Sequence, residues 1–318
     1  MTTRVLFRRL PALVAAVALA AAAAGCGSSA AKPTQHSNGA AASGTFPVTV
    51  TAANGAVRIA KRPTAIISLA PTATEMLYAL GAGSQVTAVD RYSNYPASAP
   101  RTNLSGLTPN IEAIVARKPD LVVVSNYAAN LTKRLAAFGI PVLSLPAPAN
   151  VTGVYSEFDE LGAATGHEQQ AKAEVSKLRQ EIAAIVAQVP HQSKPLTYYY
   201  ELDQTYYSVT SVTFIGRLLG LLGMKSIADT AKGASASGGY PQLSAEFIVK
   251  ANPDYIILAD TICCHQDAST VASRPGWASM AAVKDKHIIL LNDNIASRWG
   301  PRIVNLLATV AAGIQGSK

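Results

Sequence analysis

The chain carries one short pattern twice. Residues 111–124 read IEAIVARKPDLVVV and residues 245–258 read AEFIVKANPDYIIL. Both copies have glutamate in second place, Ile-Val near the middle and Pro-Asp before an apolar run, and they are offset by 134 positions. A period this long excludes a solenoid, whose repeats span about 20–50 residues. We therefore expect two similar lobes, each built around one copy.

Each copy predicts a helix followed by a strand. Asn110 and Ser244 stand just before the copies, where their side chains can cap a helix. The helix must end before the proline, and the apolar run after Pro-Asp is typical of a strand buried on both faces of a parallel sheet. Strands and helices alternate in both halves, so we expect an α/β fold with two similar lobes and parallel-rich central sheets.

Two further segments organise the chain. Asn54-Gly55 lies between alternating residues and predicts a β-hairpin. The stretch from His167 to Val189 lacks Pro and Gly and predicts one helix of about 30 Å, a spine between the lobes. The expected division is a leader at 1–25, a tether at 26–45, an N-terminal lobe at 46–150, a linker at 151–194 with the spine at about 167–189, and a C-terminal lobe at 195–318.

The first residues resemble a secretory leader. A short basic start is followed by an apolar run that is too short to favour a membrane-spanning helix, and then by Ala23-Ala24-Gly25-Cys26. These four residues resemble a bacterial lipobox, so we expect lipidation of Cys26 and a lipid anchor on the outer face of the cell membrane. A plain signal peptide with an accidental cysteine is the alternative. The small polar residues after Cys26 predict a flexible tether.

Charge and motifs exclude several functions. Loss of the three leader arginines lowers the formal charge from +8 to +5, and no basic run accompanies it, so we expect no nucleic-acid partner. The chain contains no P-loop, HExxH or GxSxG motif, which argues against an enzyme.

Several segments together resemble the iron-siderophore and vitamin B12 substrate-binding proteins of ABC importers. The segments are RPTAIISLAPTATEMLYALGAG, YSNYP, the two repeated stretches, RPGWASMAAVKDKHIILLNDN and SRWGPRIV, within residues 46–314. The resemblance implies a monomer that holds a small molecule between two rigid lobes, without a cofactor, and delivers it to an ABC permease and its ATPase. It also implies that Glu112 and Glu246 dock into arginine pockets of the permease. A helix-capping carboxylate is the simpler explanation for either residue alone.

Ligands of α/β lobes lie at the carboxyl ends of the strands. The residues there are rich in Tyr and Arg, which suit an anionic, often aromatic, iron(III) chelate. The expected ligand-binding residues are Pro71, Thr72, Arg91, Tyr92, Tyr127, Tyr206, Tyr207, Tyr240, Arg298 and Trp299.

The resemblance leaves the ligand open between a ferric siderophore, a corrinoid and haem, in that order. Tyr92 and Tyr240 fall where the B12-binding members place aromatic cage residues, and Arg298 falls on a cleft arginine. Two cage tryptophans of those members fall at about Gly106 and Ser125, and this loss favours the siderophore.

Cys263-Cys264-His265 admits three interpretations. Outside the membrane, adjacent cysteines favour a vicinal disulfide, while free thiols or a metal site are the alternatives. Three ligands adjacent in sequence crowd one another, and we expect no metal. A metal- or thiol-redox protein built on this trio is the competing function.

Overall fold

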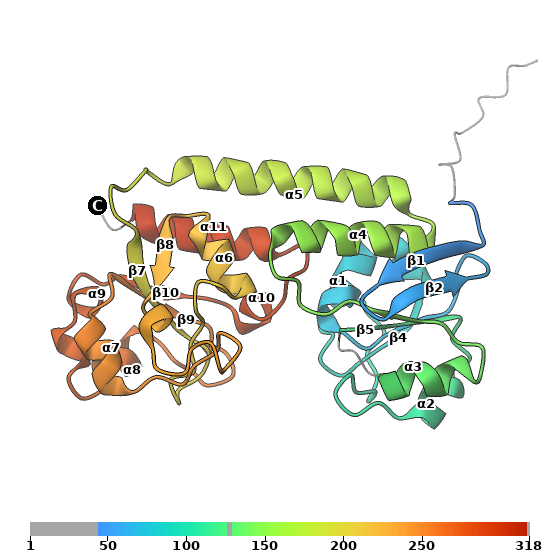
Figure 1. Cartoon of the computed structure of the whole chain (residues 1–318), viewed down its shortest axis with the longest axis horizontal. Coiled ribbons are helices and arrows are strands. Elements are labelled where there is room, and N and C mark those ends of the chain that lie inside the picture. The colour runs from blue at the N-terminus through green and yellow to red at the C-terminus, as the bar shows by residue number, and fades with distance from the viewer. Residues whose placement is uncertain (1–43, 126–128, 317–318) are drawn as a thin grey trace, which may run out of the picture. The chain divides into compact units, whose positions relative to one another are not determined.

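A computed structural model of the chain describes residues 44–125 and 129–316 (Figure 1). The described residues belong to the unit Ala41–Lys318. The expected leader, Cys26, most of the tether and Tyr127 lie outside the described residues.

The N-terminal lobe contains a hairpin and a parallel sheet. The hairpin pairs β1 (Val48–Ala52) with β2 (Gly55–Ile59) antiparallel. The sheet has the order β4-β3-β5-β6, and its strands are β3 (Ile66–Ser68), β4 (Val86–Val89), β5 (Leu121–Val124) and β6 (Val142–Ser144). Its helices are α1 (Pro71–Ala79), η1 (Ala82–Gln85), α2 (Ile111–Val115) and α3 (Ala129–Ala136).

The C-terminal lobe contains a second parallel sheet, with the order β10-β9-β7-β8. Its strands are β7 (Leu196–Glu201), β8 (Met224–Ser226), β9 (Tyr255–Leu258) and β10 (Ile288–Leu290). Its helices are α6 (Phe214–Gly220), η2 (Ile227–Thr230), α7 (Ala245–Ala251), α8 (Ala268–Ala272), η3 (Trp277–Ser279), α9 (Ala281–Lys284), α10 (Asp293–Ala296) and α11 (Ile303–Gln315).

The two sheets have the same topology. If the strands of each sheet are counted along the chain, both sheets have the spatial order second, first, third, fourth. The repeated pattern forms α2 and β5 in one lobe and α7 and β9 in the other, so each copy supplies the third strand of its sheet. The expected fold of two similar α/β lobes with parallel sheets is confirmed.

The Pro-Asp of the repeat has a structural role in both lobes. The Asp120 carboxylate accepts hydrogen bonds from the backbone N–H groups of Thr64, at 3.0 and 3.1 Å, and Ala65, at 3.0 Å. The Asp254 carboxylate accepts from the backbone N–H and the hydroxyl of Thr197, both at 2.7 Å. Each aspartate therefore holds the start of the neighbouring first strand and helps to set its register.

Helix α5 runs across both lobes, and α4 lies beneath it over the N-terminal lobe (Figure 1). The spine α5 covers Glu168–Gln188 with His167 as its N-cap, and α4 covers Val151–Thr165, where the sequence predicted only a linker. Helix α5 contacts both α4 and α11. The largest apolar core cluster includes Leu77 of α1, Phe158 of α4 and Leu307 of α11, so the lobes share one continuous core beneath the spine.

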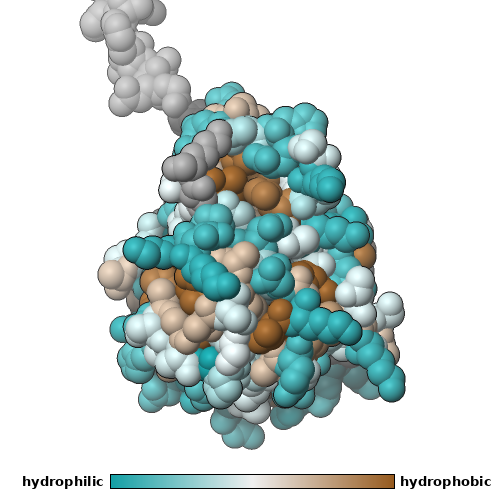
Figure 2. Space-filling view, turned by 90° about the vertical axis from the view of Figure 1, so that its left-hand side faces the viewer, coloured by the Kyte–Doolittle hydropathy of each residue, from teal (hydrophilic) through white to brown (hydrophobic). Residues whose placement is uncertain are grey.

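Surface hydropathy gives no sign of a large apolar face on the side seen in Figure 2. Hydrophobic residues appear there as separate small areas among hydrophilic ones. None of the helices within residues 44–125 and 129–316 has the length and apolar character needed to cross a bilayer.

The contact between α4 and α5 depends on a residue without a side chain. A Cβ atom added at Gly162 would lie 2.5 Å from the Cβ of Ala171. We predict that Gly162→Ala forces the helices apart and lowers the free energy of unfolding by about 1–3 kcal/mol, measured by chemical denaturation.

The matched control is Gly220→Ala in α6, where an added Cβ meets no atom within 4 Å. Alanine is the better helix former, so this variant should be neutral or slightly stabilising. The double variant Gly162→Ala/Ala171→Gly should recover part of the lost stability. Equal stability of the two single variants would contradict a close helix contact at Gly162.

Candidate functional site

The strand order of each sheet predicts where a ligand binds, at the carboxyl ends of the strands. The order second, first, third, fourth puts a switch point between the first and third strands, where the loops leave in opposite directions. In the N-terminal lobe this point lies between β3 and β5. In the C-terminal lobe it lies between β7 and β9.

A pocket of about 440 Å³ opens at the N-lobe switch point and is completed by the C-terminal lobe. Residues after β3, β4 and β5 form one wall, and α10 with the loop after it forms the other. The lining residues are Ala70, Pro71, Thr72, Arg91, Tyr92, Asn94, Arg101, Ser125, Asn294, Ser297, Arg298 and Trp299. The pocket therefore lies between the lobes.

Six of the ten expected ligand-binding residues line this pocket. They are Pro71, Thr72, Arg91, Tyr92, Arg298 and Trp299. Tyr206, Tyr207 and Tyr240 do not line it, although Tyr240 is 41% exposed, and Tyr127 lies outside the described residues.

Arg91 and Arg101 give the pocket a positive wall. Both side chains are exposed, and no carboxylate of the described residues lies within ion-pair distance of either guanidinium. The guanidinium of Arg91 lies 5.9 Å from the ring centre of Tyr92, which is 54% exposed. Both groups are free to meet an anion.

Arg101 and Asn94 were not found by sequence reasoning. Arg101 reaches the pocket because its segment folds back along β4, where Thr102 donates its backbone N–H to the Val89 carbonyl at 3.0 Å. No local signal in the sequence predicts that return.

Arg298 lines the pocket and also binds residues of both of its walls. It is only 8% exposed, and Nη1 donates to Glu75 Oε1 of α1 at 2.8 Å. Nη2 donates to the Tyr92 carbonyl at 3.0 Å and to Asn294 Oδ1 at 2.8 Å. The guanidinium thus holds the pocket walls together, and few of its donors remain for a ligand.

Glu75 is the centre of a buried ionic network between the lobes. Its side chain is fully buried, and besides Arg298 it binds Arg302, whose Nε and Nη2 donate at 2.8 and 2.5 Å. A glutamate inside the apolar stretch TATEMLYAL was the only sequence signal for it. Such a carboxylate needs buried cations, and the opposite lobe supplies them.

A second contact between the lobes involves a pocket residue. The Trp299 indole N–H donates to Glu157 Oε2 of α4 at 2.9 Å. Burial raises the pKa of Glu157 to about 8, although the indole hydrogen bond opposes this shift. Glu157 therefore keeps its proton at neutral pH and orients Trp299 without a buried charge.

The cysteines differ from the expectation of a vicinal disulfide. Cys263 and Cys264 are both free thiols, and Cys263 is exposed. Hydrogen bonds fix the turn instead, because the Asp293 carboxylate accepts the backbone N–H groups of Ile262 at 2.9 Å and Cys263 at 2.7 Å. Within residues 44–125 and 129–316, no three His, Cys, Asp or Glu side chains are placed to hold a metal ion.

The two repeated glutamates occupy equivalent places. Glu112 and Glu246 are exposed and lie in the first turns of α2 and α7, behind the caps Asn110 and Ser244. The pKa of Glu246 is lowered by hydrogen bonds from its own backbone N–H and from Ser244. Each lobe thus presents one of these two carboxylates to solvent.

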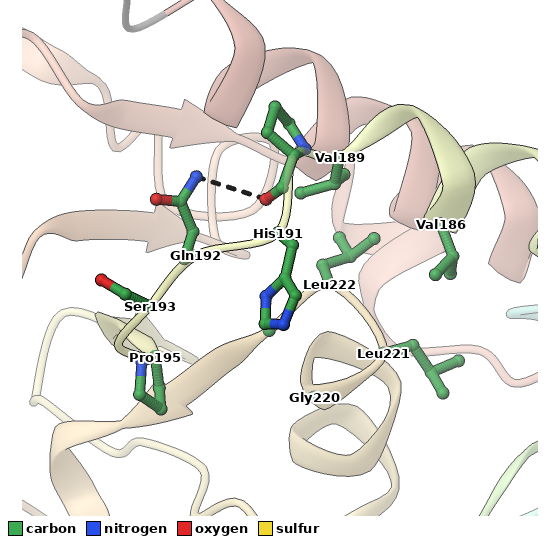
Figure 3. A pocket seen from close by; sticks show the side chains of 11 residues that line it. Val186, Val189, His191, Gln192, Ser193, Pro195, Gly220, Leu221 and Leu222 are labelled. Atoms are coloured by element: carbon green, nitrogen blue, oxygen red, sulfur yellow. Dashed lines mark hydrogen bonds between the residues drawn. The ribbon is translucent and has the colours of Figure 1, made fainter.

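A second hollow, of about 540 Å³, lies at the opposite edge of the C-terminal sheet (Figure 3). Val186, His191 and Leu221 line it, where α5 ends and the chain turns into β7 and β8. It faces the amino ends of these strands, whereas ligands of α/β sheets bind at the carboxyl ends. We therefore place the functional site in the pocket between the lobes.

Comparisons with known proteins find several relatives of this chain. The sequence profile of the family described as periplasmic binding protein matches residues 66–295. The chain is 30% identical to an uncharacterized ABC transporter substrate-binding lipoprotein, YvrC of Bacillus subtilis, over 85% of this chain and 86% of that protein. It is 32% identical to a cobalamin-binding protein of Halobacterium salinarum, over 88% of this chain and 77% of that protein.

A solved structure is also similar. It is that of a possible iron-binding (periplasmic solute-binding) protein from Staphylococcus epidermidis, with 28% identity and a TM-score of 0.68. The match covers 80% of this chain and 99% of that one. These relatives are binding proteins and not enzymes.

The ionic network of Glu75 can be tested by removing its centre. Glu75→Ala leaves two buried or half-buried guanidinium groups without their partner, so we predict a loss of about 3–5 kcal/mol in the free energy of unfolding. Chemical denaturation followed by circular dichroism measures it.

Lys177→Ala is the control, because it removes only a surface ion pair with Glu174, in which Lys177 is 58% exposed. That pair should contribute at most about 1 kcal/mol. Equal losses in the two variants would mean that the Glu75 network is solvated and does not hold the lobes.

Proposed function

The chain belongs to the periplasmic binding protein family, and on that premise we propose that it captures a ferric siderophore for an ABC importer. Its relatives include a substrate-binding lipoprotein of an ABC transporter. The pocket between the lobes is the capture site in this proposal. An iron(III) chelate is its cargo and not a resident cofactor.

Two arginines of the pocket favour an anionic ligand. Arg91 and Arg101 face the same hollow, and the described part of the chain offers neither of them a carboxylate. Like charges on one wall repel each other until an anion arrives. Ferric catecholates are anionic and aromatic, so the arginines can pair with them while Tyr92 stacks.

A corrinoid is the second candidate. The relative from Halobacterium that is called a cobalamin-binding protein favours it. Against it, the position expected for one cage tryptophan is closed in this fold, because a Cβ atom at Gly106 would lie 2.1 Å from the Leu69 carbonyl oxygen. Ser125 lines the pocket in place of the other ring. Haem ranks third.

The proposal includes a membrane anchor and a permease. Lipidation of Cys26 keeps the protein at the outer face of the membrane, which is supported by the name lipoprotein given to the Bacillus relative. Glu112 and Glu246 then serve as docking charges for arginines of the permease. One carboxylate on each lobe fixes the orientation of the loaded protein.

The ligand proposal is tested with purified mature protein. Tryptophan emission and calorimetry are recorded with a ferric catecholate, a ferric hydroxamate, ferric citrate, haem and cobalamin. We predict that Arg91→Gln and Arg101→Gln each weaken binding of the ferric catecholate about tenfold or more, because each removes a charged hydrogen bond worth about 1.5–3 kcal/mol.

Arg58→Gln is the matched control, because Arg58 is exposed on β2 and does not line the pocket. It should bind like the parent. If cobalamin binds most tightly and the pocket variants bind it normally, the corrinoid replaces the siderophore as the ligand.

The docking proposal predicts a separation of binding from transport. Glu112→Ala/Glu246→Ala should keep the ligand affinity and melting temperature of the parent, since both side chains are exposed and outside the pocket. Cellular uptake of radiolabelled ligand should fall sharply. Lysine at both sites should reduce uptake further, because it sets like charges against the permease arginines.

Normal uptake by the double alanine variant would contradict the docking role, and the two glutamates would then only stabilise the first turns of their helices. Loss of ligand affinity would instead show that the ligand site has been placed on the wrong face of the lobes.

A further inference from the structure

Two acidic side chains lie buried at the switch point of the C-terminal lobe. Glu201 is the last residue of β7, and Asp260 follows β9, the neighbouring strand. Both residues are completely buried. They lie at the carboxyl ends of these strands, which is the end at which the sheet of the other lobe forms the pocket.

The positive charge of Arg274 acts on both acids. Arg274 binds Glu201 through two hydrogen bonds, each of 2.6 Å, and the Tyr199 hydroxyl donates to Glu201 at 3.0 Å. No hydrogen bond from another described residue reaches either carboxylate oxygen of Asp260. Two ionised carboxylates against one guanidinium would leave a buried, unbalanced negative charge, which is costly in a protein interior.

A proton removes this imbalance. If Asp260 is protonated, its hydroxyl can donate to Glu201 and the three side chains become neutral together. Burial and the adjacent Glu201 carboxylate raise the pKa of Asp260 to about 7, against the opposing effect of Arg274. The site therefore changes charge close to neutral pH.

The same residues hold the loops that follow β7 and β9. Arg274 donates to Gln266 Oε1 at 2.7 Å, and its guanidinium lies 5.5 Å from the ring centre of Tyr206. The Asp260 carbonyl accepts the backbone N–H groups of Cys264 at 3.3 Å and Gln266 at 3.4 Å. A change of charge in the buried pair thus reaches the loops after both β7 and β9.

We propose that Glu201 and Asp260 share one proton, and that this proton holds the loops after β7 and β9, the second of which bonds to Asp293 of α10 in the pocket wall. Asp260 is then a positioning residue that acts on ligand through the loops 202–207 and 261–266. Loss of the proton leaves a buried charge that the loops must relieve by opening to water.

Among the described residues, Arg274 is the cation that lowers the pKa of Asp260. The charged or titratable side chains that interact with Asp260 come from β7 and from the segment after α8; they are Tyr199, Tyr200, Glu201 and Arg274. Arg274 is the only cation in this set, and Glu201 already uses it.

Trp277 allows the proton to be observed without any ligand. The chain has two tryptophans, so Trp299→Phe leaves Trp277 as the sole emitter. Trp277 is fully buried, with the Arg274 guanidinium 4.5 Å and the Tyr199 ring centre 5.8 Å from its ring. Emission is recorded from about pH 5.5 to about pH 8.5 in the Trp299→Phe protein, where histidines also titrate.

We expect one transition with a midpoint near pH 7 in this parent, and none after Asp260→Asn. Asparagine donates to Glu201 permanently and so mimics the protonated acid. Both proteins keep their histidines, Glu157 and Glu160, so a transition that survives Asp260→Asn belongs to another group and overturns the proposal. A parent without a transition overturns it as well.

Thermal stability gives a second, independent readout. An acid whose pKa is raised in the folded state holds more protons folded than unfolded, so its contribution falls as pH rises from about 4 to about 7. The melting temperature of Asp260→Asn relative to the parent should therefore rise over this window and then level off. A constant difference would contradict the shared proton. Glu157 and Glu160 are unchanged in the comparison.

The consequence for binding rests on the proposed function. A ferric catecholate should bind the otherwise native protein severalfold more weakly at about pH 8 than at about pH 6, while Asp260→Asn should change less. If the emission transition is present but the chelate does not bind, the ligand proposal fails and the shared proton stands. If the chelate binds with equal pH dependence in both proteins, the positioning role of Asp260 fails.

Discussion

The buried carboxylate of Glu75 constrains the whole arrangement of the two lobes. It belongs to α1 of the first lobe, and both of its guanidinium partners, Arg298 and Arg302, come from the second. Separating the lobes would strand one negative and two positive charges, so this contact resists opening. The core shared under α5 acts in the same direction, because its burial is also lost on separation. The pocket therefore has walls that are largely formed before a ligand arrives, which reduces the cost of ordering them on binding.

Much of the fold could be predicted because its signals are local. The side chain of Asn110 caps α2 by accepting a hydrogen bond from the Ala113 N–H at 3.0 Å. Ser244 caps α7 in the same way by accepting from the Phe247 N–H at 3.1 Å. The β-hairpin follows from Asn54-Gly55, where Gly55 has a φ of 97°. The repeat predicted two lobes. In each sheet, one copy supplies the third strand and an aspartate that binds the start of the first strand. These are interactions between residues close in sequence or on adjacent strands.

The site was predicted less completely because its partners are distant in the chain. Arg298 and Glu75 are separated by 223 positions, and nothing near Arg298 shows that a buried acid will take its donors. Arg101 enters the pocket through a loop that returns along β4. Helix α4 was missed within a segment interpreted as linker, although Asn150 caps it and Gly166 ends it at a φ of 74°. Composition alone cannot rank such long-range contacts.

The charges on the two sides of the cleft connect ligand class with pH. Arg91 and Arg101 line the pocket without a carboxylate partner among the described residues, and the other lobe contains two buried acids and one cation. An anionic chelate adds negative charge to this field and so favours the protonated form of the Glu201–Asp260 pair. Linkage is reciprocal, so protonation must favour the anion to the same degree. A ligand without net charge has no such electrostatic coupling, and only movement of the loops could then link its affinity to pH. The slope of affinity against pH therefore carries information about ligand charge, independent of which chelate or corrinoid is tried first.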